Sequence, residues 1–259
     1  MDASAVPYAV AAAGTALALV CALTERRGGA ALGRTPEGGR PDTTLALLPA
    51  VPAWLLSEAI GVALGGVGAA GVVAVTCGHV AVVVPLVPWL LRRSPAAPAA
   101  LARRLACGVG GGLAAYGLAG LVGLVVTWGY AQAGAPVPEQ NVVEVLREAP
   151  ALSLGALIGS AAVLAPCAEE VLFRGLLLNA LAQRMPRHVA LLAQALLFGF
   201  IHFAAVPSMW PLALPLAVVG WCAGWLYLRT GSLLAAVVLH ATFNGLQIAL
   251  LFLTGGAGG

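Results

Sequence analysis

Residues 151–183 read ALSLGALIGSAAVLAPCAEEVLFRGLLLNALAQ, an apolar run interrupted by a group of charges. About 20 apolar residues, at about 1.5 Å of rise each, carry a helix across a bilayer, so the run is long enough to span a membrane. It nevertheless contains Glu169, Glu170 and Arg174. Charges inside an apolar span are costly unless they pair or act in a site. The run therefore predicts a transmembrane helix that carries functional groups.

The composition of the whole chain agrees with a membrane protein. Of 259 residues, 61% are hydrophobic and 9% are charged, whereas a soluble domain has about 25% charged residues. The mean hydropathy is +0.96. We therefore predict an all-α integral membrane protein. The net charge of only +3, with no basic tract, excludes nucleic acid as a partner.

The apolar runs predict about eight membrane-spanning helices. They lie at residues 6–23, at two stretches of 45–91 that are divided at Gly65–Gly66, and at 105–130, 151–183, 189–206, 211–228 and 233–254. A short interfacial helix is predicted at 141–148. We divide the chain into an N-terminal membrane region of about four helices without an assigned role (1–150), a core (151–254) and a flexible tail (255–259).

The arginines predict the orientation, because cytoplasmic loops are enriched in positive charge. The chain has 13 basic residues, and all of them are Arg. With the N-terminus outside, 11 of these fall in cytoplasmic loops: Arg26, Arg27, Arg34, Arg40, Arg92, Arg93, Arg103, Arg104, Arg184, Arg187 and Arg229. We therefore predict a multi-pass protein of the cell or inner membrane with both termini outside, whose first span is an anchor rather than a cleaved signal peptide.

The cysteines favour free thiols. There are five, an odd number, each within an apolar stretch, and no two have CxxC spacing. This pattern favours neither a disulfide framework nor a thiolate zinc site.

Two glutamates and one arginine form the densest polar cluster. Glu170 and Arg174 are four residues apart, the spacing at which helical side chains meet. Glu169 lies about 100° around the helix from Glu170 and can point elsewhere. One carboxylate is therefore left without a cation and is the candidate for a general base or acid. A buried ion network that only holds helices together is the alternative.

Two further predicted spans contribute polar groups. His202 lies four residues after Phe198, and His240 and Asn244 share one helix face. A lone His in an apolar helix is often a satisfied core residue, and a His/Asn pair can be an interhelical hydrogen bond. If these groups converge in one polar cavity, the free-energy cost of burying them is lower than that of three separate burials. A carboxylate, a histidine and two donors suit activation of water and stabilisation of an oxyanion, so we predict hydrolysis of an acyl bond within the membrane.

These three elements, in this order, resemble the CPBP family of intramembrane proteases, also called the Abi or type II CAAX prenyl endopeptidase family. The family pattern is EExxxR, FxxxH and HxxxN. This chain has Glu169-Glu170…Arg174, Phe198…His202 and His240…Asn244, and Ala165-Pro166 precedes the glutamates. The resemblance covers residues 151–254, about two-fifths of the chain.

The resemblance implies a role for each residue. Glu169 would activate the attacking water with help from His202. His240 and Asn244 would hold the oxyanion. Glu170 and Arg174 would organise the site.

The resemblance leaves dependence on a metal open, because the family was first described as metal-dependent and a metal-free, glutamate-activated water is the competing view. Catalytic zinc commonly has three protein ligands plus water. Glu169, His202 and His240 would be the ligands if one divalent metal such as zinc were required. The chain has no HExxH motif, and we favour metal-free catalysis.

The sequence is compatible with three functions. The first is an endopeptidase that acts on a membrane-associated peptide or lipidated protein, with a prenylated CAAX-like sequence as one candidate. The second is a non-catalytic membrane protein that binds a peptide or gives bacteriocin immunity. The third is a proton-coupled transporter, against which the chain shows no internal repeat. The sequence has neither HExxH nor GxGD, and no serine in a GxSG setting, which disfavours other intramembrane protease classes.

Overall fold

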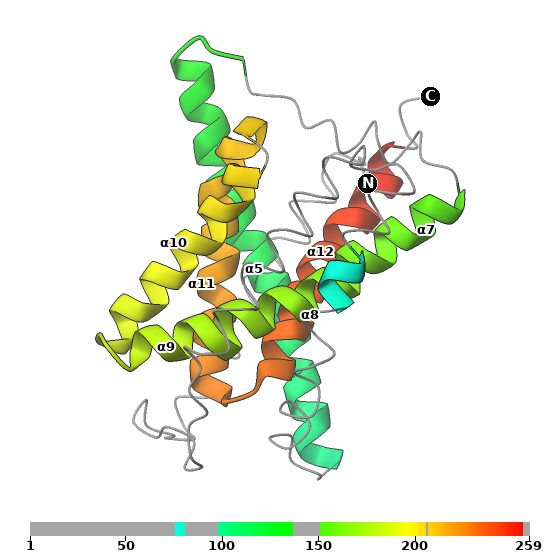
Figure 1. Cartoon of the computed structure of the whole chain (residues 1–259). Helices are drawn as coiled ribbons and strands as arrows, with labels where there is room; N and C mark the ends of the chain where they lie inside the picture. The colour runs from blue at the N-terminus through cyan, green and yellow to red at the C-terminus, as the bar shows by residue number, and fades with distance from the viewer. Residues whose placement is uncertain (1–75, 81–97, 137–150, 206, 256–259) are drawn as a thin grey trace.

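The computed structural model describes residues 76–80, 98–136, 151–205 and 207–255 (Figure 1). The regular elements in these ranges are helices, which confirms the predicted all-α class for this part of the chain. Residues 76–80 form a short helix. The labelled elements are α5 (Pro98–Gln132), α7 (Ala151–Gly159), η4 (Ser160–Leu164), α8 (Ala165–Glu170), η5 (Val171–Leu178), α9 (Asn179–Ala182), α10 (Arg187–Ala205), η6 (Pro207–Leu212), α11 (Ala213–Thr230) and α12 (Leu233–Gly255).

Among the described residues, four helical stretches are long and apolar enough to cross a membrane. They are Leu101–Gln132, Leu154–Ala182, Trp210–Thr230 and Leu233–Leu253. The protein is therefore a multi-pass membrane protein. The apolar stretch Arg187–His202 of α10 is shorter, so a full span at 189–206 stays a prediction.

The remaining predicted helices cannot be compared with the structure. The span at 6–23, the two within 45–91 and the interfacial helix at 141–148 lie outside the described residues, apart from residues 76–80. The total of eight spans therefore stays a prediction.

The helix α5 begins earlier than the apolar pattern predicts. Its first residue is Pro98, whereas the predicted span starts at residue 105. Proline suits the first helical position because its fixed φ is already helical and its missing N–H would have no partner there. Arg103 and Arg104, expected in a loop, thus lie in the second turn of the helix.

Residues 151–182 form one helical rod, in which two π-helical segments interrupt the α-helix. The π-helical segments η4 and η5 flank α8. Pro166 is the second residue after η4, and a proline inside a helix donates no hydrogen bond and crowds the carbonyl one turn earlier. The wider turn accommodates this crowding. π-turns inside α-helices occur frequently at functional sites, and α8 ends with the two glutamates of the predicted site.

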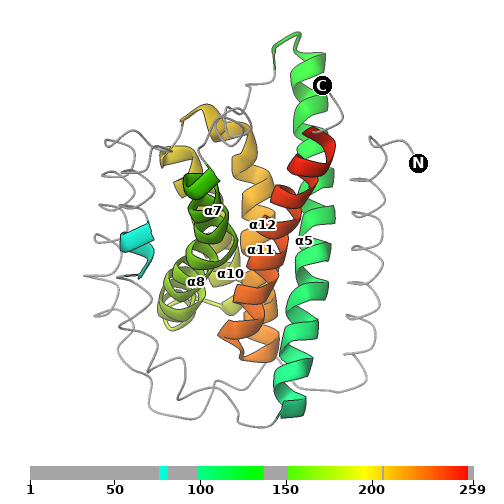
Figure 2. The same ribbon diagram turned by 90° about the vertical axis from the view of Figure 1, so that its right-hand side faces the viewer.

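The helices pack in three layers (Figures 1 and 2). α11 and α12 form the middle layer, with α5 on one side and the α7–α9 rod and α10 on the other. α10 and α11 form a hairpin that is connected through η6. Close approach of α10 to α11 requires Gly199, because a Cβ at that position would collide with the carbonyl oxygen of Ala213. Small residues at helix interfaces permit such close packing in membranes.

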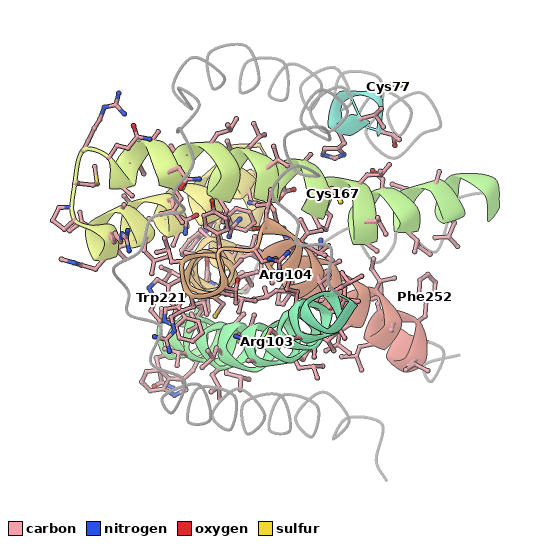
Figure 3. All side chains as sticks on the ribbon, turned by 90° about the horizontal axis from the view of Figure 1, so that it is seen from below. Cys77, Arg103, Arg104, Cys167, Trp221 and Phe252 are labelled. Atoms are coloured by element: carbon pink, nitrogen blue, oxygen red, sulfur yellow. The ribbon has the colours of Figure 1, made fainter. Side chains whose placement is uncertain are left out.

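The positively charged helix ends lie on one side of the bundle. The start of α5, the α9–α10 turn and the α11–α12 turn point to the lower side of Figure 1. Figure 3 views this side and labels Arg103 and Arg104; Arg184, Arg187 and Arg229 belong to the other two turns. This grouping agrees with the predicted alternation of loops, while the compartment that this side faces stays a prediction.

Three of the described cysteines, Cys77, Cys167 and Cys222, are free thiols, as the sequence predicts. Cys21 lies outside the described residues. Figure 3 shows Cys77 on the short helix of residues 76–80 and Cys167 on α8.

Candidate active site

The predicted ion pair between Glu170 and Arg174 is present and fully buried. Arg174 Nη1 lies 2.8 Å from Glu170 Oε1, and both side chains have 0% exposure. Arg174 Nη2 donates to the backbone carbonyl of Gly220 in α11 at 2.9 Å. The guanidinium carbon lies 4.8 Å from the centre of the Phe198 ring, within the range of a cation–π contact. Arg174 is therefore held by groups from three helices.

Glu170 also orients His240 of α12. His240 Nδ1 lies 2.9 Å from Glu170 Oε1. A carboxylate oxygen accepts hydrogen bonds, so Nδ1 carries the hydrogen of this bond. The other ring nitrogen, Nε2, faces Glu169 Oε2 at 3.9 Å. The hydrogen bond with Glu170 thus fixes which edge of His240 is turned toward Glu169.

His202 of α10 presents the same edge to Glu169. Its Nδ1 lies 2.7 Å from the carbonyl oxygen of Phe198, which again requires the hydrogen on Nδ1. Its Nε2 lies 3.7 Å from Glu169 Oε2. The Phe198 ring packs against both imidazoles, with centroid distances of 4.7 Å to His202 and 5.5 Å to His240. Phe198 therefore separates and supports the two histidines.

Glu169 is the group on which both histidines converge. Its Oε2 has no hydrogen-bond partner among the described residues. The separations of 3.7 and 3.9 Å are longer than a direct hydrogen bond, so neither imidazole is hydrogen-bonded to this oxygen. The Glu169 side chain is 9% exposed and that of His202 is 27% exposed. The site is therefore closed around the glutamates and accessible at His202.

Asn244 lies one turn after His240 on α12, as predicted, and contacts a different part of the site. Its Nδ2 donates to the carbonyl oxygen of Ala161, in the π-helical segment η4, at 2.8 Å. A carboxamide nitrogen carries two hydrogens, so this bond engages one N–H and leaves the second for another acceptor. The bond also joins α12 to the rod that carries Glu169.

The five residues Glu169, Glu170, Arg174, His202 and His240 thus meet in one cluster drawn from three helices, with Asn244 beside it. A carboxylate beside two imidazole nitrogens is suited to proton transfer. In both imidazoles Nδ1–H donates to a carboxylate or carbonyl oxygen. Histidines that bind a metal through the other ring nitrogen commonly make the same hydrogen bond. In the part of the chain that the structure describes, however, no group of three or more His, Cys, Asp or Glu is arranged to hold a metal ion.

Two amides near the site, half-buried Asn179 and fully buried Gln194, were not predicted from the sequence. Asn179 Nδ2 lies within 3.0 Å of the carbonyl oxygens of Arg174 and Gly175, in the wide helical segment η5, and 2.8 Å from the Tyr227 hydroxyl. Gln194 is fully buried in α10. The spacing of Gln194 in the sequence could have indicated its position. It precedes Phe198 by four residues and His202 by eight, so it lies on the same face of the helix as these two residues.

Comparison with known proteins adds one finding. Residues 151–246 match the family model described as Type II CAAX prenyl endopeptidase Rce1-like. Comparisons with curated proteins and with solved structures gave no match. The matched residues include the whole cluster around Glu169 as well as Asn244. Residues 151–246 of this chain are therefore similar to the Rce1-like type II CAAX prenyl endopeptidase family, which is the family that the three motifs resemble.

Proposed function

We propose that this protein is an intramembrane endopeptidase in which Glu169 activates the water that hydrolyses a peptide bond. The observation that carries the proposal is the environment of Glu169 Oε2. This oxygen is buried, has no hydrogen-bond partner among the described residues and faces two imidazole Nε2 atoms at 3.7 and 3.9 Å. Glu170, by contrast, has fixed hydrogen bonds to Arg174 and His240 through Oε1, as expected of a carboxylate that holds helices together.

In the proposed reaction, Glu169 removes a proton from water and the hydroxide oxygen forms a bond with the carbonyl carbon of the substrate. His202 Nε2 accepts the second hydrogen bond of this water and so orients it. The carbonyl oxygen becomes an oxyanion. The proton held by Glu169 then passes to the amide nitrogen as the C–N bond breaks, which gives a carboxylic acid and an amine. General base catalysis of this kind contributes about 10²–10⁴-fold to a rate.

His240 and Asn244 are the proposed donors to the oxyanion. In the form with both ring nitrogens protonated, His240 keeps its bond to Glu170 through Nδ1 and donates to the oxyanion through Nε2. Asn244 donates through the N–H that Ala161 does not engage. Donors that are fixed before the reaction stabilise developing charge without reorganisation.

Glu170 and Arg174 are the proposed organisers of the site. Glu170 Oε1 binds both Arg174 and His240. Two carboxylates with one guanidinium leave one net negative charge. Arg174 therefore prevents two negative charges from facing His240 alone, and Glu170 keeps the ring in its working orientation.

The proposed substrate is a membrane-associated peptide or lipidated protein, with a prenylated CAAX-like sequence as one candidate. The support is the family match and the position of Glu169 and His240 in apolar helices that are long enough to span a membrane. Residues 151–254 form the proposed core, and both termini lie outside in the proposed orientation.

The test is hydrolysis of a quenched library of prenylated and hydrophobic peptides by the purified full chain. Glu169→Gln, which keeps the shape of the side chain, and His202→Ala are run beside the wild type, and each reaction is repeated with a chelator. We expect Glu169→Gln to lower kcat about 10²–10⁴-fold while thermal unfolding is unchanged. Inhibition by the chelator would assign Glu169, His202 and His240 to a metal instead. Equal hydrolysis by wild type and Glu169→Gln would sink the proposal, and peptide binding without hydrolysis would favour a binding or immunity protein.

A further inference from the structure

Gln194 is a buried amide that is joined to the Glu170–Arg174 ion pair through a shared backbone carbonyl. Its side chain lies in α10 with 0% exposure. Its Nε2 donates to the carbonyl oxygen of Gly220 at 3.0 Å and lies 3.2 Å from the carbonyl oxygen of Leu191. Gly220 O is also the acceptor for Arg174 Nη2 at 2.9 Å. One backbone oxygen of α11 therefore joins Gln194 to Arg174.

The shared carbonyl connects Gln194 to the reacting groups. Arg174 binds Glu170, and Glu170 binds His240 through the same carboxylate oxygen that accepts from Arg174. His240 Nε2 then faces Glu169. A displacement of Gly220 O would therefore move the guanidinium, and through it the orientation of His240.

The helix α11 has glycines where this arrangement needs space. A Cβ at position 224 would lie 2.6 Å from Gln194 Nε2, and one at position 220 would lie 3.1 Å from Phe198 Cβ. The first glycine leaves room for the amide. The second lets α10 approach until the amide reaches the carbonyl.

We propose that Gln194 is a positioning residue that sets the orientation of His240 through Gly220 O, Arg174 and Glu170; this inference rests on the proposed function. The simpler reading is an interhelical hydrogen bond that only stabilises the packing of α10 on α11. Against that reading, Gln194 Oε1 is buried with no hydrogen-bond partner among the residues that the structure describes. A residue kept only for stability would be replaced by an apolar side chain without the cost of an unsatisfied oxygen.

The test uses the full chain in detergent micelles with ¹⁵N-labelled histidine. Gln194→Met keeps the length of the side chain and removes its donor. We expect kcat to fall about tenfold, which corresponds to one lost hydrogen bond, with KM unchanged. The Nδ1 signal of His240, assigned from its loss in His240→Gln, is expected to shift.

Tyr227→Phe is the matched control. It removes the Asn179–Tyr227 hydrogen bond of 2.8 Å, which also joins the rod to α11 but does not reach the Arg174 side chain. We expect it to lower the unfolding temperature while kcat and the His240 signal keep their wild-type values. Gly224→Ala is the second variant, because its Cβ displaces the Gln194 amide while Gln194 itself is kept. It should shift the His240 signal in the same direction.

The outcomes separate the two proposals. If Gln194→Met and Gly224→Ala lower thermal stability but leave kcat and the His240 signal unchanged, Gln194 is only a structural residue and the inference is wrong. If the wild type hydrolyses no peptide, the proposed function fails, and the His240 signal alone then decides whether Gln194 orients the imidazole. A shift in both variants and none in Tyr227→Phe supports the inference in either case.

Discussion

The helix α12 has two faces that are built by opposite means. Toward α5 it packs against glycines, and a Cβ at Gly108 or Gly112 would lie 2.5 Å from Val238 Cβ or Thr242 Cβ, respectively. Toward the α7–α9 rod it presents His240, which is hydrogen-bonded to the buried Glu170. The first face is held by close van der Waals packing, and the second by charges that must stay paired.

The comparison shows how a single apolar helix combines a structural and a chemical task. Packing on glycine fixes the distance and rotation of α12 without polar groups. Once this rotation is fixed, His240 and Asn244 face the rod. We therefore expect substitutions on the glycine face to affect stability, and those on the polar face to affect hydrolysis as well.

The largest effect on stability is expected from Arg174→Met. This substitution leaves Glu170 buried without its guanidinium partner, and breaking a buried pair on one side costs about 3–5 kcal/mol. The free energy of unfolding in micelles measures it. The double variant Glu170→Gln, Arg174→Met should recover part of the loss, whereas Arg103→Met, at an exposed position, should change little. A loss for Arg174→Met no larger than that for Arg103→Met would contradict the buried pair.

A smaller effect, confined to catalysis, is expected from Asn244→Ala. Removal of one oxyanion donor lowers kcat about 10²–10³-fold. The measurement is kcat for the peptide used with the wild type. Thr242→Val is the control, because Thr242 lies two residues away on the face of α12 that packs against Gly112, and it should keep the wild-type kcat. Equal kcat values for Asn244→Ala and Thr242→Val would remove Asn244 from the mechanism.

The smallest effect is expected from Gly112→Ala on α5. The added Cβ would lie 2.6 Å from the backbone oxygen of Leu239, so α5 must move away from α12, and overpacking of this kind costs about 1–3 kcal/mol. Thermal unfolding is the measurement. Gly120→Ala is the matched control on the same helix, since a Cβ at position 120 meets nothing within 4 Å. If both variants unfold at the wild-type temperature, glycine packing does not hold this face.

Local features of the site could be predicted from the sequence. The Glu170–Arg174 pair depends on one helical turn, and the structure shows it at 2.8 Å. The shared helix face of His240 and Asn244 depends on the same periodicity. The predicted start of α5 was seven residues late, because apolar patterning follows the hydrocarbon layer and not the helix, which continues to Pro98.

Contacts between helices could not be predicted. Gln194 and Gly220 are separated by 26 residues, and Asn244 and Ala161 by 83. Their partners are backbone carbonyls, which every residue has, so no residue type identifies them. The wide turn at η4, which carries the Ala161 carbonyl, also departs from the regular spacing on which sequence patterns depend.

The sequence by itself determined the membrane class, the apolar spans near residues 105–130, 151–183, 211–228 and 233–254 and the identities of the charged groups, since these depend on composition and on the repeat of one helix. Only the tertiary structure decided that Glu169 faces two imidazole Nε2 atoms and that Arg174 and Gln194 share Gly220 O. The physical reason is that the rotation of each helix and its distance from its neighbours depend on packing at small residues such as Gly199 and Gly112. These packing contacts add up over the whole bundle.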